Sequence, residues 1–409
     1  MREKRIRALA AVRSRTGCRA EPDGDNHAER VRAALPGNGR LTLRKGIARL
    51  GSVVRPAYGE NASQRLVCGG GERSSGSRRS DGGNIRTIGG GPNRLGHPFD
   101  AAVPPNGYAW WYLDALSSDG ARGLTIIAML GNVFSPYYAL ARRRGAAQPL
   151  THCAMNVAIY EPRAKRWAMT ERPNGDLHRT ATELHIGRSS ASWDGDCLTF
   201  SLHEMCVPIP SRIKGQVRVY PDRLFNVAFP LDPSGAHSWM PIAPRARIEV
   251  DLAEPDVRWT GEAYVDCNFG SEPLEASFDR WNWARAHTDA GTLIAYDTEM
   301  RDGRKQSIFR VFDTSGAISD VPAPPLRDLP VGSVWRVPRR ARCDAGGILR
   351  IKKTLEDTPF YTRSIIASVI DGRSITMMHE SLSLSRFSKP IVQAMLPFRM
   401  PRWAVRSRA

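Results

Sequence analysis

Cysteines are few in this sequence and form no recognisable pattern. The seven that occur among 409 residues include no CxxC pair and no Cys/His spacing typical of a metal site. Neither a disulfide framework nor a structural zinc site is therefore indicated. We expect reduced thiols in a cytoplasmic protein that binds no metal.

Long apolar runs are also missing. No segment approaches the roughly 18 uninterrupted apolar residues of a membrane-spanning helix, and residues 1–19 carry arginines where a secretory signal would have its apolar centre. The glycine-rich segments 69–83 and 89–92 lack the GK[ST] ending and the strand–loop–helix setting of a phosphate loop. We therefore expect no nucleotide site, and contact with a membrane only at its surface.

The net charge of +18 is concentrated near the start of the chain, where residues 1–99 contain 20 Lys and Arg but 8 Asp and Glu. This region is poor in aromatic residues and rich in Arg, Gly and Ser, as linkers are. We predict a basic, mostly disordered tail over residues 1–95, with a short helix near 27–35. Such a tail could touch nucleic acid or anionic lipid, or have no role. We expect no nucleic-acid partner.

From about residue 97, short runs of β-branched, aromatic and aliphatic residues recur between turns rich in Gly, Asp, Asn and Pro. Strands at this spacing, without helical periods between them, predict an all-β fold of sandwiches or barrels. We expect two packed β domains, 96–245 and 246–403, with the Pro-rich segment 321–330 as a loop or an edge spacer. The predicted strands are 108–116, 123–130, 153–160, 197–202, 216–221, 246–252, 291–300, 307–312, 334–338, 347–355, 365–370 and 374–387.

Four of the ten tryptophans fall within residues 237–285. Residues 262–269 in this stretch have the composition of a strand, whose side chains alternate between two faces. His237 and Trp239 are two apart and share a face in the same way. These faces belong either to a sheet with one solvent-exposed and one buried face, or to a pocket where an acid, an imidazole and aromatic rings meet. The polar-aromatic face would hold Glu262, Tyr264, Asp266 and Asn268, and the opposite face Ala263, Val265, Cys267 and Phe269.

Several long motifs occur in the order found in one protein family. They are GYAWWYLDALSSDG, GNVFSPYYA followed by ARRR, NVAIYEPRAKRWAMTER, IGRSSASWDGD, HSWMPIAPRARIEV and GEAYVDCNFGSEPLEASFDRWNWARA. Over residues 97–403 the chain resembles the bacterial carotenoid 1,2-hydratases, also called hydroxyneurosporene synthases. Ser238 and Cys267 depart from that pattern, and the resemblance offers no counterpart for the basic tail.

The resemblance implies two lipocalin-like β domains. It also implies addition of water, without a cofactor, to the terminal C1=C2 double bond of acyclic carotenoids such as neurosporene and lycopene. Other enzymes of carotenoid synthesis could be partners. Such a substrate is about as long as the bilayer hydrocarbon is thick, roughly 30 Å. We therefore expect one end to enter a lipocalin-like cavity while the rest stays in lipid or in a groove.

Hydration of an isolated alkene needs an acid that protonates carbon, walls that tolerate a carbocation, and a held water. Asp266 is the predicted acid, because burial against apolar walls raises a carboxyl pKa by up to several units. Trp239 and Tyr264 would face the cation, and His237 would position or deprotonate the water. Each of these four residues could instead have a purely structural role in the core or at a turn.

The remaining predicted site residues concern substrate binding. Trp281 and Trp283 would line the substrate tunnel or pack the domain interface, Glu262 is a second candidate acid, and Tyr137 is a candidate substrate contact.

Two segments, 388–408 and 137–144, mix apolar with basic residues, as surface-binding segments do. Together with the membrane-borne substrate that the resemblance implies, they predict peripheral association with the inner, intracytoplasmic membrane. Solvated basic loops are the simpler interpretation of the same residues.

Two other functions fit the same fold. A non-catalytic carrier of a hydrophobic ligand would need an apolar cavity but no buried acid. A related cyclase or pericyclic catalyst acting on another polyene would use an acid and aromatic walls but exclude water, so its product would be an isomer of its substrate.

Overall fold

Antiparallel β-strands make up most of the structure. The computed structural model describes residues 86–87 and 94–403 of the chain. Most of the predicted tail, including the helix expected near 27–35, lies outside the described residues.

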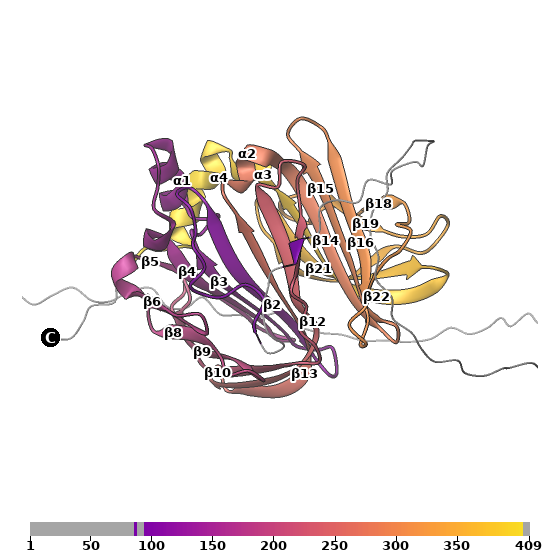
Figure 1. Ribbon diagram of the computed structural model, residues 1–409, viewed down its shortest axis with the longest axis horizontal. Helices are drawn as coiled ribbons and strands as arrows, with labels where there is room; N and C mark the ends of the chain where they lie inside the picture. Colours follow the sequence, from indigo (N-terminus) through magenta and orange to yellow (C-terminus); the bar gives the residue numbers. More distant parts are fainter. Residues whose placement is uncertain (1–85, 88–93, 404–409) are drawn as a thin grey trace, which may run out of the picture. The chain divides into compact units, whose positions relative to one another are not determined.

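The first sheet has thirteen strands in the order β5-β4-β3-β2-β13-β12-β10-β9-β8-β7-β6, with β11 paired to β12 and β1 to β11. It curls until β5 lies against β9, which makes a nearly closed barrel (Figure 1). Its strands are β1 Arg86–Thr87, β2 Tyr108–Ser117, β3 Gly123–Leu130, β4 Cys153–Tyr160, β5 Lys165–Arg172, β6 Leu177–Arg179, β7 Glu183–Ile186, β8 Ser189–Trp193, β9 Leu198–Met205, β10 Arg212–Pro221, β11 Val227–Pro230, β12 His237–Glu254 and β13 Val257–Gly270.

The second sheet has seven strands in the order β17-β16-β15-β14-β22-β21-β20, and a separate two-stranded ribbon pairs β18 with β19. Its strands are β14 Phe278–Thr288, β15 Gly291–Met300, β16 Lys305–Phe312, β17 Ile318–Asp320, β20 Arg350–Asp357, β21 Tyr361–Ile370 and β22 Arg373–Ser383; the ribbon is β18 Leu326–Leu329 and β19 Arg339–Arg342.

Alternation along the strands divides the apolar residues into layers. On β2, Trp111 and Leu113 belong to a core made from first-sheet residues, which fills the barrel. Trp110 and Tyr112 on the same strand belong to a second core, shared with β14, β15 and β22 of the other sheet. A smaller third core lies on the far side of the second sheet, against the ribbon. The middle layer is unusually rich in aromatic rings, and it positions the site.

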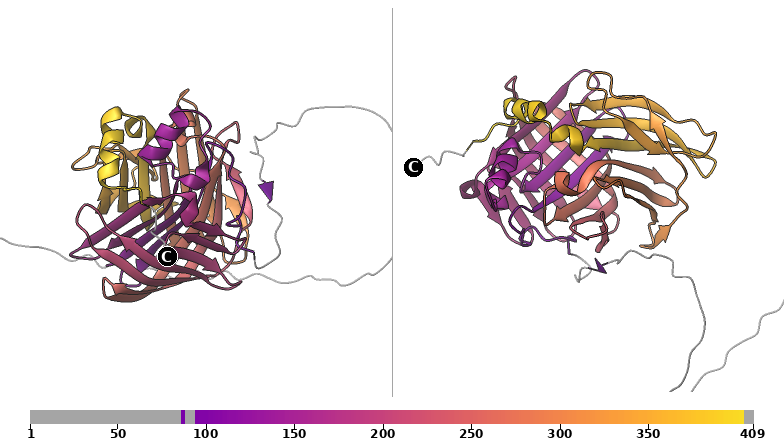
Figure 2. Two further views of the ribbon diagram at one scale, coloured as in Figure 1. Left: turned by 90° about the vertical axis from the view of Figure 1, so that its left-hand side faces the viewer. Right: turned by 90° about the horizontal axis from the view of Figure 1, so that it is seen from above.

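Short helices gather at one end of the two sheets (Figures 1 and 2). They are α1 Pro136–Arg143, α2 Leu274–Ser277, α3 Leu384–Phe387 and α4 Pro390–Met395. Helix α1 begins at Ser135, whose hydroxyl oxygen accepts hydrogen bonds from the backbone N–H groups of Tyr137 and Tyr138. No helix among the described residues has the length and apolar character needed to cross a membrane.

The predicted all-β fold with two packed β parts is confirmed, and β3, β4 and β15 have the predicted bounds. The predicted strand 334–338 is wrong. The backbone N–H of Val334 is bound by the carboxylate of Asp357, and Arg336 adopts a left-handed conformation, so this segment turns instead of pairing. Part of the predicted loop 321–330 forms β18.

The change from one sheet to the other falls between β13 and β14, and not at the predicted boundary near 245. Arg245 lies inside β12, an 18-residue strand that bends at register shifts between Pro241 and Ala246 while keeping its partner β13. The Pro and Ala residues there mark a bend within one sheet. The predicted boundary divided the strand-rich region into two β domains of similar length, which does not match this division between the sheets.

Candidate active site

A cavity of about 360 Å³ lies in the aromatic layer between the two sheets. Residues of β2, β3, β4, β5 and β13 border it from the first sheet, and residues of β14, β15 and β22 from the second. The barrel interior is filled by its own apolar core. The cavity therefore lies outside the barrel and not inside it as the resemblance suggested.

Asp266 is a buried carboxyl on the wall of this cavity, with 4% of its surface exposed. Its Oδ2 atom accepts hydrogen bonds from the Tyr264 hydroxyl at 2.7 Å and from Trp239 Nε1 at 3.0 Å. Its Oδ1 atom is buried without a hydrogen-bond partner. Because both donors point to Oδ2, the proton of the neutral acid belongs on Oδ1.

Burial raises the pKa of Asp266 to about 8, and it is the largest influence on that group. The hydrogen bonds from Tyr264 and Trp239 oppose the rise, because they stabilise the carboxylate, while Glu380 and Asp114 add to it through their negative charge. At pH 7 a carboxyl of this pKa is protonated in about nine molecules of ten. The site therefore contains an acid that still holds its proton at neutral pH.

Trp239 and Tyr264 support Asp266 and do not border the cavity themselves. The structure therefore places these two residues as hydrogen-bond partners of Asp266 and not on the cavity wall. Trp281 and Trp283 do line the cavity, as predicted, and the Trp283 ring lies 5.2 Å from that of Tyr264. Tyr296 of β15, which the sequence interpretation missed, completes this aromatic wall.

His237 is fully buried but is not among the cavity-lining residues. Its Nδ1 lies 2.9 Å from the Tyr108 hydroxyl, and its Nε2 lies 3.5 Å from a carboxylate oxygen of Glu272. Burial lowers its pKa, although Asp232 and Glu272 oppose this. The structure thus contradicts a direct contact between His237 and a water in the cavity.

Glu262 and Tyr137 also lie away from the cavity. Glu262 shares the face of Asp266 on β13, as the alternation predicted, but it lies beyond the buried part of the strand and forms an exposed ion pair with Arg245. Tyr137 is half-buried in the first turn of α1. The structure therefore does not bring these two residues together with Asp266 at the cavity.

The sequence interpretation missed three further carboxyls on the cavity wall: Glu356 and Asp357 of β20 and Glu380 of β22. For Glu380 the available signal was a polar residue inside the otherwise strand-like run 374–387, at a position where a largely buried charge needs a partner. Among the described residues, no group of His, Cys, Asp and Glu is arranged to hold a metal ion. The five described cysteines are buried and unpaired.

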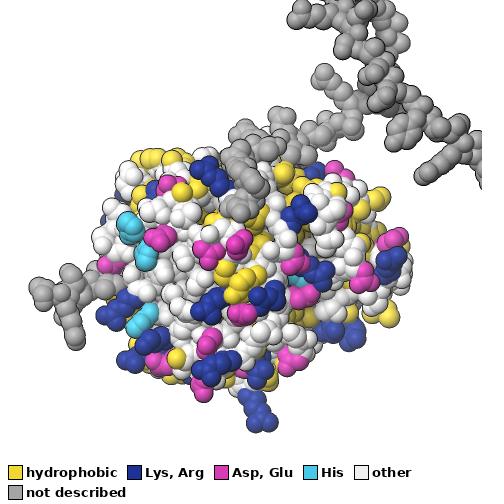
Figure 3. All heavy atoms as spheres, turned by 60° about the horizontal axis from the view of Figure 1, so that its bottom comes forward, with side chains coloured by type: hydrophobic (Ala, Val, Ile, Leu, Met, Phe, Trp, Pro, Cys, Tyr) yellow, Lys and Arg dark blue, Asp and Glu magenta, His cyan; other side chains and the backbone are white. Residues whose placement is uncertain are grey.

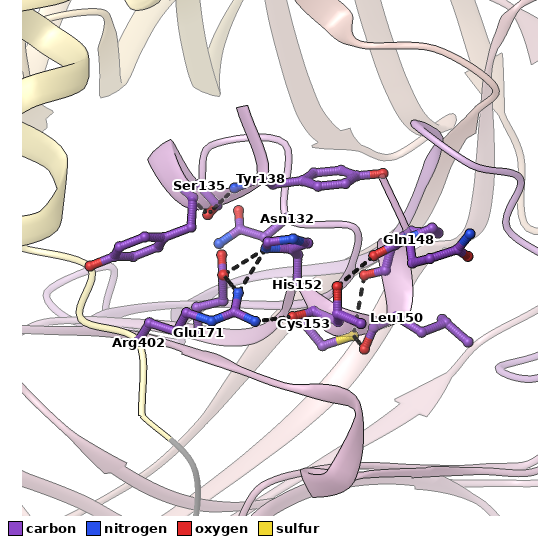
Figure 4. A network of polar contacts seen from close by, with 12 residues as sticks. Asn132, Ser135, Tyr138, Gln148, Leu150, His152, Cys153, Glu171 and Arg402 are labelled. Atoms are coloured by element: carbon purple, nitrogen blue, oxygen red, sulfur yellow. Dashed lines mark hydrogen bonds and ion pairs between the residues drawn. The ribbon is translucent and has the colours of Figure 1, made fainter. Parts of the chain in front are cut away.

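The segment after β22 closes the helical end of the cavity. Met395, Leu396, Arg399 and Met400 line it from α4 and the turn that follows. The chain then reaches the edge strand β5, where Arg402 pairs with the buried carboxylate of Glu171 and donates a hydrogen bond to the Thr151 carbonyl at 2.9 Å (Figure 4). His152 Nδ1 lies 2.8 Å from the same carboxylate. This cluster fastens the segment over the cavity.

Comparison with known proteins identifies one family model and several similar proteins that share a name. Residues 126–409 match the family model described as "Carotenoid hydratase CrtC". The acyclic carotenoid 1,2-hydratase of Thiocapsa roseopersicina is 49% identical, over 92% of this chain and 93% of that protein. The enzymes of the same name from Rubrivivax gelatinosus and Rhodobacter capsulatus are 44% and 35% identical, over 94% and 68% of this chain and 94% and 98% of theirs.

The first two of these alignments extend into the basic tail, because they cover more of the chain than residues 96–409 contain. The expectation that the tail has no counterpart among relatives is therefore wrong. The Rhodobacter capsulatus relative aligns over nearly its whole length with 68% of this chain.

Proposed function

Because the chain belongs to the carotenoid hydratase family, we propose that it adds water to the terminal C1=C2 double bond of acyclic carotenoids and that Asp266 supplies the proton. The observation that carries the role of Asp266 is its buried carboxyl at the cavity wall, with Oδ1 unpartnered and a pKa that burial raises to about 8. The enzyme acts on the end of a long hydrocarbon, so the cavity needs to hold only that end.

The reaction begins with transfer of the Asp266 proton to C2. The electron pair of the double bond forms the new C–H bond, and the positive charge develops at the tertiary carbon C1. The rings of Trp281 and Trp283 stabilise this charge through their π-faces, an effect of about 2 kcal/mol or more for a desolvated cation. Water then bonds to C1 and loses a proton, which gives the tertiary alcohol.

Tyr264 and Trp239 contribute by stabilising the carboxylate that proton transfer leaves behind. Their donors are already in place at Oδ2 before the reaction, so no reorganisation is needed when the charge appears. Two opposing effects therefore act on Asp266. Burial keeps the carboxyl protonated, and the two hydrogen bonds stabilise the carboxylate that remains after proton transfer.

The direct test is expression of the full chain and of Asp266→Asn in cells that accumulate lycopene or neurosporene, with pigments analysed by chromatography and mass spectrometry. We expect a product heavier by one water with the unaltered chain and none with Asp266→Asn. Glu262→Gln is the matched control, because this carboxyl lies on the same strand but is exposed. A water adduct formed by Asp266→Asn would move the acid elsewhere, and an isomer without mass gain would indicate a cyclase.

We further propose that the helical end of the molecule docks on the membrane that holds the substrate. Exposed apolar side chains surround the segment that covers the cavity: Ile391 is 68% and Phe398 77% exposed, and Trp403 and Leu140 are also exposed. Basic residues lie exposed among them, including Lys389 and Arg399. This combination suits an anionic lipid surface. By contrast, the face shown in Figure 3 intersperses Lys and Arg with Asp and Glu.

Sedimentation with vesicles tests this docking. We expect binding to vesicles that contain anionic lipid, weaker binding to zwitterionic vesicles, and loss of binding in a variant with Ile391→Ser and Phe398→Ser. Ile209→Ser is the control, since Ile209 is equally exposed but lies in the β9–β10 connection. Equal binding by both variants would contradict docking through this end.

A further inference from the structure

A second carboxyl faces the cavity from the sheet opposite Asp266. Glu380 belongs to β22 of the second sheet, whereas Asp266 belongs to β13 of the first, and both border the same cavity. Tyr112 connects them: it is the strand partner of Asp266 across β2 and β13, and its hydroxyl donates a 2.8 Å hydrogen bond to Glu380 Oε1. An isoprenoid end held in the cavity therefore lies between an acid on one wall and a carboxylate on the other.

The charges around Glu380 favour its ionised form. Arg363, 1% exposed, donates to Glu380 Oε1, to the Tyr112 hydroxyl at 2.6 Å and to Asp114 Oδ1 at 2.6 Å. Arg285 forms the other ion pair of Asp114. Two guanidinium groups thus face two carboxylates, and this buried cluster is neutral when Glu380 carries its charge. A protonated Glu380 would leave one buried positive charge uncompensated.

Glu380 is nevertheless a usable base. Burial raises its pKa above the ordinary value, while the ion pair with Arg363 and the hydrogen bonds from Tyr112 and Tyr361 oppose that rise. A carboxylate whose pKa lies above that of a free Glu takes up a proton more readily near neutral pH. Asp266 and Glu380, two of the carboxyls that line the cavity, therefore differ in their surroundings: Asp266 has no ion-pair partner among the described residues, whereas Glu380 is ion-paired with Arg363.

Hydration needs such a base, since the water that bonds to C1 must release a proton. His237 does not border the cavity, so it has no direct path to that water. We propose that Glu380 is a catalytic residue that accepts this proton, an assignment that rests on the hydratase function proposed above. As the new C–O bond forms, the water O–H bond breaks and its proton passes to the Glu380 carboxylate. The proton then returns to Asp266 through the shared cavity, which restores both groups for the next turnover.

The decisive experiment compares Glu380→Gln and Glu380→Ala with the unaltered full chain, using purified protein and lycopene in detergent or lipid. We expect kcat for hydration to fall roughly 10²- to 10⁴-fold in both variants, the usual range for loss of a general base. Formate or acetate should restore part of the activity of Glu380→Ala, since these carboxylates can enter the vacated space and accept the proton. Chloride is the control, because it balances the charge of Arg363 but is a negligible base.

Three results would overturn the assignment. Glu380→Gln with an unchanged kcat would show that the carboxylate is not needed, and rescue of Glu380→Ala by chloride as effective as by formate would show that Glu380 only balances Arg363. No rescue by formate in a folded Glu380→Ala would also count against a base. If the unaltered chain itself forms no water adduct, the hydratase function fails instead, so the two failures are distinguishable.

A milder variant covers the case in which changes at Glu380 prevent folding. Tyr112→Phe removes one donor from Glu380 Oε1 but keeps the ion pair with Arg363. That hydrogen bond lowers the pKa of Glu380, so its loss should raise the pKa. Activity is lost as pH falls through the pKa of the base, and this acidic limb should therefore move to higher pH in Tyr112→Phe. An unmoved acidic limb in a folded variant would contradict the proposal.

Discussion

The Tyr112 hydroxyl donates a 2.8 Å hydrogen bond to Glu380 Oε1 across the boundary between the two sheets. The two residues are 268 positions apart in the chain, and Tyr112 is also the strand partner of Asp266. One tyrosine thus connects Asp266 and Glu380, two of the carboxyls that line the cavity. Proton delivery and proton removal are thereby assigned to different sheets.

The state of Asp266 predicts how activity depends on alkaline pH. Only the protonated carboxyl can deliver a proton, and its pKa is raised to about 8. We therefore expect kcat/KM to fall about tenfold per unit once pH exceeds about 8. Initial rates of hydration between pH 6 and pH 9.5 check this. A rate that stays constant to pH 9.5 would mean that Asp266 is not the acid.

Asp266 also affects stability with a definite sign. The unfolded chain releases this proton near pH 4, whereas the folded protein keeps it to about pH 8. Rising pH therefore favours unfolding over this window. Asp266→Asn does not titrate, so its stability relative to the unaltered protein should grow by about 3–4 kcal/mol between pH 5 and pH 8. Urea unfolding at both pH values measures this difference in the free energy of unfolding. If the difference is the same at pH 5 and pH 8, the pKa of Asp266 is not raised in the folded protein.

Tyr264 should control the strength of the acid. Tyr264→Phe removes the 2.7 Å donor to Asp266 Oδ2, which stabilises the carboxylate. We expect kcat to fall roughly tenfold, as for loss of one strong hydrogen bond to a charge, and the alkaline limb of the pH profile to move upward. Tyr108→Phe is the comparison, because that hydroxyl contacts His237 and not Asp266. If the alkaline limb moves by the same amount in both variants, the cause is a general loss of packing around the site and not the hydrogen bond to Asp266.

The cluster of Arg402, Glu171 and His152 should hold the cover of the cavity in place. Arg402→Met leaves the 1% exposed carboxylate of Glu171 without its guanidinium partner, and we expect a loss of about 1–3 kcal/mol in stability. Trypsin should then cut faster within residues 384–403. Adding Glu171→Gln should recover part of the stability, since the unpaired charge is gone. No recovery in the double variant would show that the ion pair is not the fastening contact.

The sequence was sufficient for many of the strands, including β3, β4 and β15, and for the placement of part of the site. Alternation along residues 262–269 placed Asp266 and Asn268 on one face and Val265 and Cys267 on the other, as the two core layers confirm. That grouping depends only on local geometry, so it could be predicted.

The rest of the candidate site depends on how the two sheets pack against each other. Glu380, Arg363 and Asp114 meet across two sheets, and no local pattern indicates which buried charges pair. The same reason explains the errors at His237 and Glu262. Both share a strand face with site residues, but only the packing of the second sheet decides which part of that face borders the cavity.

The covering segment also has a consequence for the order of assembly. Residue 402 meets residue 171, a separation of 231 positions, so this contact can form only after both sheets have been synthesised. Until then the aromatic wall of the cavity is open to solvent at the helical end. During folding, this aromatic wall is therefore an exposed apolar surface until the covering segment is in place. In that interval an apolar membrane surface or a chaperone can bind it.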